Sequence, residues 1–318
     1  MTSTNDTGAS GIGVRLTRFA WLSIAAAIAT IALKLVAWRL TGSVGLLSDA
    51  AESVVNLVAA IIALIALTVA ARPADHNHHY GHGKAEYFSA AVEGLMIFAA
   101  AAVIIVTAVQ RLLHPQELEQ LGIGLAISLV ATAINGVVGV VLIRVGRRHR
   151  SATLSADGKH LLTDVWTSAG VLVGVLLVGI TGWLPLDAIV AIAVALNILV
   201  TGSKLVSSSV TALLDVALSP EDQAIVTAVL DRHRSADVDF HGLQTRESGR
   251  LRFVSMHVLV PGAWTVQRAH DVVELVEADL REALDGVDIT THVEPREDQR
   301  SYDDARYDAT TPRPGGSA

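Results

Sequence analysis

The stretch SADGKHLLTD, residues 155–164, places three ionisable side chains beside a long apolar run. Asp157, His160 and Asp164 lie 0, 3 and 7 residues along one helical stripe. Ionisable side chains are costly inside lipid and are usually kept there for function. Because imidazole nitrogen and carboxylate oxygen both bind divalent metal ions, the stripe indicates a cation site.

A second stripe of the same kind occurs in SDAAESVVN, residues 48–56. We expect Ser53 to serve packing, which leaves three other polar side chains on this stripe: Asp49, Glu52 and Asn56. If the two helices face each other, each supplies a pair of ligands four residues apart, which together satisfy a tetrahedral divalent ion.

Two alternatives stay open at this point. The whole set could form only a buried salt bridge or hydrogen-bond network that ties two helices together. Asp49 and Asp157 lie nearer the starts of their helices, where an interaction with the helix dipole explains them as well as contact with an ion does.

The composition indicates a membrane part followed by a soluble part. The 318 residues are 51% hydrophobic and only 17% charged, with a mean hydropathy of +0.48, which is too apolar for a soluble domain. The chain has no cysteine, so a metal would be held by nitrogen and oxygen ligands. A net charge of −7 and the lack of a basic patch argue against nucleic acid as a partner, and nothing indicates an organic cofactor.

Six apolar segments are long enough to cross a lipid bilayer, which takes about 20 residues. Arginine and lysine are concentrated in alternate connections, which predicts that both termini face the cytosol. The polar lead, residues 1–14, has no secretory signal and is expected to be disordered. We place the membrane domain at residues 15–215, with spans near 16–40, 45–71, 87–112, 120–144, 155–181 and 185–213.

The remainder of the chain has a different pattern of apolar and polar residues. Residues 219–296 alternate in the order helix, strand, strand, helix, strand, which predicts a small two-layer α+β domain. Residues 297–318 are charged and then rich in proline and glycine, and we expect them to be disordered.

Three stretches of the membrane part together resemble the cation diffusion facilitators: SDAAESVVN, RPADHNHHYGHGKAEYFSA and HLLTD. The resemblance covers about residues 15–296. It implies a homodimeric divalent metal/proton antiporter, with six transmembrane helices and a C-terminal cytosolic ferredoxin-like domain. It also implies that Glu52, Asn56, His160 and Asp164 form the transport site.

This site departs from the zinc-type pattern of the family, which has His or Asp followed by Asp on the second span. Glu52 and Asn56 supply only oxygen, and Asn56 is neutral. Because oxygen ligands suit harder ions, iron(II) and manganese(II) are candidates beside zinc.

The resemblance implies further sites outside the bilayer. In the loop 72–84, it points to a second metal site at Asp75, His78 and His82, whereas we expect His76 and His79 to be solvated. Lys84 and Asp215 match a charge pair between protomers; the alternative is an ordinary pair flanking the membrane. In the cytosolic domain, the implied regulatory ligands are His241, His257, His270, His292 and Glu294.

We therefore expect a secondary active transporter of the cell membrane, not an enzyme. It would export Zn²⁺, Fe²⁺ or Mn²⁺ from the cytosol in exchange for protons. The alternative is a membrane-anchored metal sensor that acts through its cytosolic domain. An intramembrane metalloenzyme has little support, because the chain has neither HExxH nor GxSxG.

Overall fold

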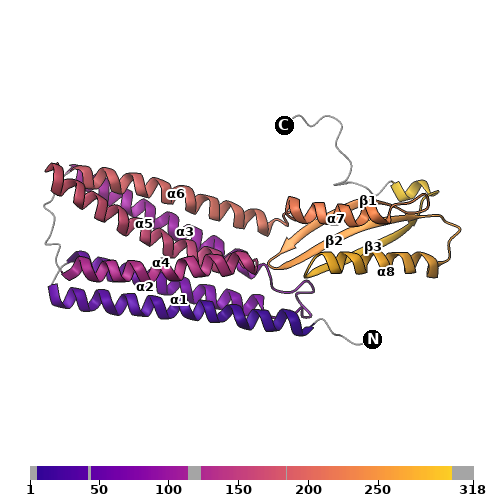
Figure 1. The fold of residues 1–318 in the computed structure, drawn as a ribbon, viewed down its shortest axis with the longest axis horizontal. Helices are drawn as coiled ribbons and strands as arrows, with labels where there is room; N and C mark the ends of the chain where they lie inside the picture. Colours follow the sequence, from indigo (N-terminus) through magenta and orange to yellow (C-terminus); the bar gives the residue numbers. More distant parts are fainter. Residues whose placement is uncertain (1–5, 42–43, 114–122, 184, 303–318) are drawn as a thin grey trace. The chain divides into compact units, whose positions relative to one another are not determined.

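The computed structural model describes residues 6–41, 44–113, 123–183 and 185–302. The N-terminal part consists of six long helices (Figure 1). They are α1 (Asp6–Thr41), α2 (Val44–Ala70), α3 (Ala85–Leu113), α4 (Ile123–Arg148), α5 (Ala152–Thr181) and α6 (Pro185–Leu213). The shortest has 26 residues, which at 1.5 Å per residue gives about 39 Å, more than the thickness of a bilayer core.

Several of these helices contain long apolar spans. Within the described residues, spans in α1, α3, α4 and α6 are both long and apolar enough to cross a membrane. In α2 the apolar stretch found among the described residues, Asn56–Ala70, is shorter.

The outer faces of the six helices expose large apolar side chains. Trp21, Phe88, Val137 and Ile180 are each more than half exposed in the isolated chain. Such a surface is unfavourable in water and favourable against lipid. The predicted six-helix membrane fold is therefore confirmed.

Two expected disordered segments contain regular structure. Helix α1 begins at Asp6, within the lead 1–14 that was expected to be disordered. Extending an existing helix costs far less than starting one, which lets α1 run beyond its apolar part. In the C-terminal segment, residues 299–302 form a short 3₁₀-helix (Gln299–Tyr302), while 303–318 lie outside the described residues.

Glycine brings α4 and α5 into close contact. A Cβ atom added to Gly158 would lie 2.7 Å from the carbonyl oxygen of Gly139, and one on Gly139 would lie 3.0 Å from that of Gly158. Only residues without a side chain allow this approach, as is common between helices in membranes. The crossing lies directly beside the polar stripe of α5, because Gly158 follows Asp157.

The chain divides into two compact units, residues 1–211 and 212–318. The second unit contains α7 (Pro220–His233), β1 (Asp239–Ser248), β2 (Leu251–Val260), α8 (Val266–Ala283) and β3 (Val287–Pro295). This is the predicted order. Ser219 caps α7 by accepting a hydrogen bond from the backbone of Asp222, and Thr265 caps α8 in the same way.

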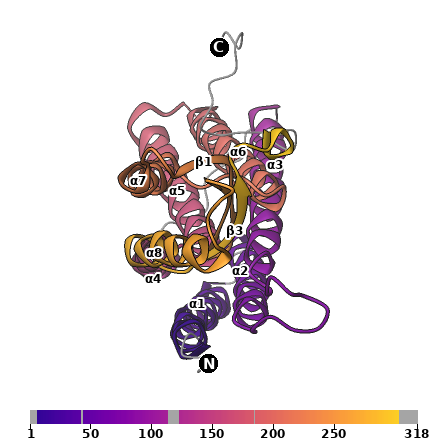
Figure 2. The same cartoon turned by 90° about the vertical axis from the view of Figure 1, so that its right-hand side faces the viewer.

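The three strands form one sheet in the order β1-β2-β3, with β1 antiparallel and β3 parallel to β2. Figure 2 shows α7 and α8 on the same side of this sheet. Met256 and Val258 of β2 pack into the core with Val226 of α7 and Val276 of α8. Because side chains alternate along a strand, His257 lies on the opposite face from Met256 and Val258.

Candidate metal centres

The polar stripes of α2 and α5 meet inside the membrane unit. Nε2 of His160 lies 2.9 Å from Oδ1 of Asn56, and Nδ2 of Asn56 donates a hydrogen bond to Oδ2 of Asp164. Asn56 and His160 are each only 3% exposed. The structure thus brings together three of the four side chains expected at the transport site. The side chains of Glu52 and Asp49 lie outside the described residues.

The Asn56 amide links the other two side chains through hydrogen bonds of defined direction. Because its nitrogen donates to Asp164, its oxygen can only accept, and His160 must donate from Nε2. The amide thus satisfies Nε2 of His160 and one oxygen of Asp164, whereas Nδ1 of His160 is buried with no hydrogen-bond partner among the described residues. A metal ion that binds Nε2 of His160 has to replace the proton on that nitrogen.

Sequence reasoning missed Asn135 on α4, which also reaches this cluster. Its Nδ2 lies 3.5 Å from Oδ2 of Asp164, the oxygen that also accepts from Asn56. Asn135 is 3% exposed, and its Oδ1 is buried with no hydrogen-bond partner among the described residues. An asparagine in the otherwise apolar stretch AISLVATAINGVVGVV was the signal that could have pointed to it.

Asp157 and Glu93 are buried carboxylates outside this cluster. Asp157 is 1% exposed, and neither of its oxygens meets hydrogen-bond geometry with a described residue, although Ser23 of α1 interacts with it at longer range. Asp157 lies beyond the first turn of α5, where a helix dipole acts only weakly. Glu93 of α3, also missed from sequence, is fully buried and accepts a hydrogen bond from Ser89 at 3.4 Å.

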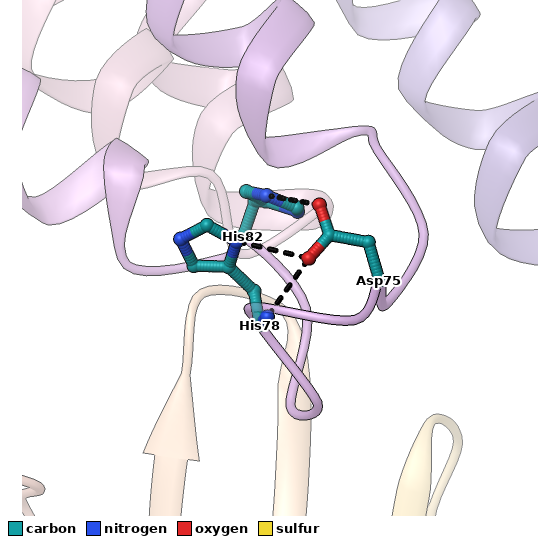
Figure 3. A group of neighbouring side chains, drawn as sticks. All are labelled: Asp75, His78 and His82. Carbon is teal, nitrogen blue, oxygen red and sulfur yellow. Dashed lines mark hydrogen bonds and ion pairs between the residues drawn. The ribbon is translucent and has the colours of Figure 1, made fainter.

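The loop between α2 and α3 gathers the predicted second group (Figure 3). Asp75 Oδ1 lies 3.0 Å from Nδ1 of His78, and its Oδ2 lies 3.4 Å from Nε2 of His82. The hydrogen bond with His78 lowers the pKa of Asp75. One potential ligand atom from each of the three residues lies within 4.8 Å of the others, close enough for a single metal ion. His76 and His79 are exposed, as expected for solvated residues.

The loop conformation is set by local backbone contacts. The carboxylate of Asp75 accepts hydrogen bonds from the backbone of Asn77 at 2.9 Å and of His78 at 2.8 Å. Such a turn is typical of aspartate and holds His78 beside its own carboxylate. Gly81, with a φ of +76°, then turns the chain toward His82 and the start of α3.

In the cytosolic unit, strand register aligns the predicted histidines. His257 pairs with His241 on β1 and with His292 on β3, so the three residues form a row across the sheet. Glu294 is 5% exposed. Its Oε2 lies 2.9 Å from Nε2 of His241 and 3.1 Å from Nδ1 of His257. His292 Nδ1 lies 3.4 Å from its other oxygen. His241, His257 and Glu294 are again close enough to share one ion.

Other implied residues do not join these groups within the single chain. His270 lies on α8, where it is exposed and its Nε2 is 3.8 Å from Glu274. Asp215 forms an ion pair with Arg246 of β1 at 3.2 Å, and its φ of +58° is unusual for a residue other than glycine. The pair between Asp215 and Lys84 was expected between protomers, so it stays a prediction.

Comparison with known proteins gives the family. Residues 20–214 match the "Cation efflux transmembrane domain", and residues 218–296 match the "Cation efflux protein, cytoplasmic domain". The chain belongs to the cation efflux family. The resemblance to the cation diffusion facilitators is therefore confirmed, and the chain is a multi-pass membrane protein of a transporter family rather than an enzyme.

Two relatives are similar over almost the whole chain. The "Uncharacterized transporter sll1263" of Synechocystis sp. is 50% identical over 289 residues, which is 91% of this chain and 93% of that protein. The "Cation-efflux pump FieF" of Serratia proteamaculans is 32% identical over 283 residues, 88% of this chain and 93% of that protein. A solved structure titled "Mode of Action of a Putative Zinc Transporter CzrB" is 34% identical, with a TM-score of 0.23; it covers 24% of this chain and 96% of its own.

Proposed function

We propose that this cation efflux protein exports divalent metal cations from the cytosol in exchange for protons. The observation that carries the proposal is the meeting of Asn56 with His160 and Asp164 inside the membrane unit. Asn56 and His160 are buried and Asp164 is half-buried. Polar side chains at such positions are costly in lipid, and these three combine the nitrogen and oxygen donors that divalent ions require.

The proposed exchange follows from competition for the same atoms. Nε2 of His160 can bind a metal ion only when the imidazole is neutral, so a second proton on the ring and a metal ion exclude each other. An unperturbed histidine titrates near pH 6.5, between the pH values of a neutral cytosol and an acidic exterior. Protons that enter from the acidic side would therefore displace the ion.

The donor set supports a broad or hard-ion preference. Asn56 offers a neutral amide oxygen, and Glu52 offers carboxylate oxygen from the same stripe of α2. Zinc favours nitrogen and thiolate, whereas iron(II) and manganese(II) accept more oxygen ligands. We propose Zn²⁺, Fe²⁺ and Mn²⁺ as substrates.

The two groups outside the membrane are proposed as additional metal sites. Asp75, His78 and His82 would bind an ion on the cytosolic loop, and His241, His257 and Glu294 would bind a regulatory ion with His292 beside them. His270 would contribute from the partner in a homodimer. We further propose that Lys84 and Asp215 pair between protomers, and that both termini face the cytosol of a cell-membrane transporter.

Flux in reconstituted vesicles tests the proposal. The purified full-length protein is placed in proteoliposomes with a pH gradient, and metal and pH are followed together with separate dyes. We expect Zn²⁺, Fe²⁺ or Mn²⁺ to cross only with counterflow of protons. Metal flux that is insensitive to the pH gradient would disprove the exchange, and no flux of any of the three would disprove transport.

A membrane-anchored metal sensor is the second candidate, and the cytosolic group favours it. Glu294 contacts both His241 and His257 there, so the potential ligands of an ion are already close together. A sensor would bind metal in the cytosolic unit with the same affinity in the flux-deficient Asp164→Ala variant as in the wild type, and it would transport nothing in either. Metal flux in the wild-type vesicles excludes a protein that only senses.

A further inference from the structure

We propose that Asn135 of α4 is a ligand of the transported cation, so that the intramembrane site is built from three helices rather than two. The proposal deepens the transport function proposed above and rests on it. It predicts that the site offers one donor more than a tetrahedral ion needs, and that this donor favours Mn²⁺ over Zn²⁺.

The position of Asn135 supports the proposal. Its Nδ2 lies 3.5 Å from the same Asp164 oxygen that accepts from Asn56, so two amides from different helices flank one carboxylate oxygen. Ligands of one metal ion lie about 3 Å apart when each is about 2.1 Å from the ion. The Asn135 amide is therefore within reach of an ion bound to Asp164.

The unsatisfied oxygen of Asn135 supports it further. Oδ1 is buried and has no hydrogen-bond partner among the described residues. A buried polar atom without a partner is costly, and such atoms in native proteins usually have an explanation such as an ion. A half turn about the terminal torsion of asparagine exchanges oxygen and nitrogen, and this torsion is roughly two-fold. In the flipped orientation the hydrogen bond to Asp164 is replaced, because the amide oxygen then lies beside Oδ2 of Asp164 and both oxygens can face a cation.

Close packing of α4 against α5 holds Asn135 in a fixed position. Gly139, one turn after Asn135, contacts Gly158 of α5 so closely that added Cβ atoms would overlap with backbone oxygen. Val138 and Leu142 pack with Leu161, which directly follows His160. A ligand on a tightly packed helix is held more accurately than a ligand on a loop.

Coordination chemistry gives the expected selectivity. Zinc is satisfied by four ligands, whereas Mn²⁺ and Mg²⁺ prefer six oxygen-rich ligands. With Glu52, Asn56, His160 and Asp164 as the other proposed ligands, an oxygen from Asn135 would make a fifth donor. Its loss should weaken Mn²⁺ binding more than Zn²⁺ binding.

The test compares Asn135→Leu, which keeps the number and branching of the side-chain heavy atoms but removes both polar atoms, with Asn135→Asp, which keeps an oxygen. Asn197→Leu is the matched control, because Asn197 lies exposed on α6. Zn²⁺ and Mn²⁺ are offered at equal concentration to proteoliposomes. We expect Asn135→Leu to lower the Mn²⁺:Zn²⁺ flux ratio about tenfold, equivalent to about 1.4 kcal/mol, and Asn135→Asp to keep the ratio high.

Equilibrium binding of Mn²⁺ and of Zn²⁺, each measured separately, distinguishes this inference from the transport proposal. It is measured on the full chain in lipid discs, with Asp75→Ala and Glu294→Ala included to remove the other two groups. Weaker Mn²⁺ binding in Asn135→Leu, with Zn²⁺ binding kept, supports the ligand role even if no flux occurs. If Asn135→Leu weakens both metals by the same factor, or neither, Asn135 only positions Asp164 and the inference is wrong.

Discussion

Asn56 determines how the ion-free site holds together, because it is the only described side chain that contacts both His160 and Asp164 there. An amide can accept from an imidazole and donate to a carboxylate at the same time. It thereby holds the hydrogen of His160 on Nε2 and provides a donor to the carboxylate of Asp164. A metal ion would break both contacts, so binding is a replacement of internal hydrogen bonds by ligand bonds.

At this scale Asp164→Ala should abolish metal flux. The substitution removes an anionic ligand and leaves two amides without their acceptor. We expect flux to fall at least about tenfold, or about 1.4 kcal/mol, while the protein elutes as wild type in size-exclusion chromatography. Flux at the wild-type rate in proteoliposomes would show that Asp164 is not a ligand.

Asn56→Asp should shift preference toward zinc. A carboxylate at this position would repel Asp164 in the ion-free state and add negative charge for the ion. We expect Zn²⁺ affinity to rise about tenfold, which is about 1.4 kcal/mol, and Glu52→His combined with it to increase the preference further. Competition transport with equimolar metals measures this; an unchanged ratio in the double variant would mean that α2 does not set selectivity.

At the scale of elements, the crossing of α4 and α5 decides whether the site can form. Gly158→Ala adds a Cβ atom 2.7 Å from the backbone of α4, which cannot give way without separating the helices. We expect a loss of about 1–3 kcal/mol of stability and reduced flux, seen as a lower melting temperature in detergent.

Gly136→Ala is the matched control on the same interface. Its added Cβ atom would lie 3.5 Å from Val165, an ordinary van der Waals contact. Because alanine favours helix by about 1 kcal/mol over glycine, this variant should be neutral or slightly more stable. Equal destabilisation of the two variants would contradict the role of the close crossing.

In the cytosolic unit, Arg252 connects three elements. It binds Asp222 at the start of α7 at 3.0 Å and also donates to the backbone oxygen of Asp285, which lies just before β3. Arg252→Ala removes the ion-pair partner of the buried carboxylate of Asp222, a kind of change that typically costs about 3–5 kcal/mol. The ion pair of Arg246 with Asp215 is more exposed, so Arg246→Ala should lower the stability by only about 1 kcal/mol. Hydrogen exchange of β2 amides in the full chain measures both, and similar effects would refute this difference.

At the scale of the whole molecule, the two units have separate cores. The cytosolic core draws on residues from Leu218 to Leu284, whereas the membrane core around Leu142 and Leu161 uses α1, α2, α4 and α5. Helices in lipid also satisfy their backbone hydrogen bonds internally. Folding of the membrane unit should therefore not need the cytosolic one.

Truncation after Leu214 should leave a folded six-helix protein that inserts into membranes but dimerises more weakly. Helix content by circular dichroism and mass by light scattering in detergent check the two parts of this expectation. A truncated protein that fails to insert would show that the cytosolic unit is required by the membrane fold. An unchanged dimer would place the main interface between the membrane helices.

The sequence by itself determined the fold class and the polar stripes. Apolar run length depends only on composition, and a stripe at 0, 3 and 7 residues follows from the period of the helix, so both could be predicted without tertiary contacts. The same holds for Asp75, His78 and His82, which are near neighbours in the chain. The α-β-β-α-β order followed from capping and alternation within short windows.

Only the tertiary structure decided which stripes share one site. Asn135 lies 29 residues from Asp164, and what brings them together is the approach of α4 to α5 through Gly139 and Gly158. Strand register, set by pairing across the sheet, placed His241 and His257 on Glu294 and left His270 on α8 apart. Helical period fixes which side chains share a face, but the partner of that face depends on packing between segments distant in sequence, which no local pattern encodes.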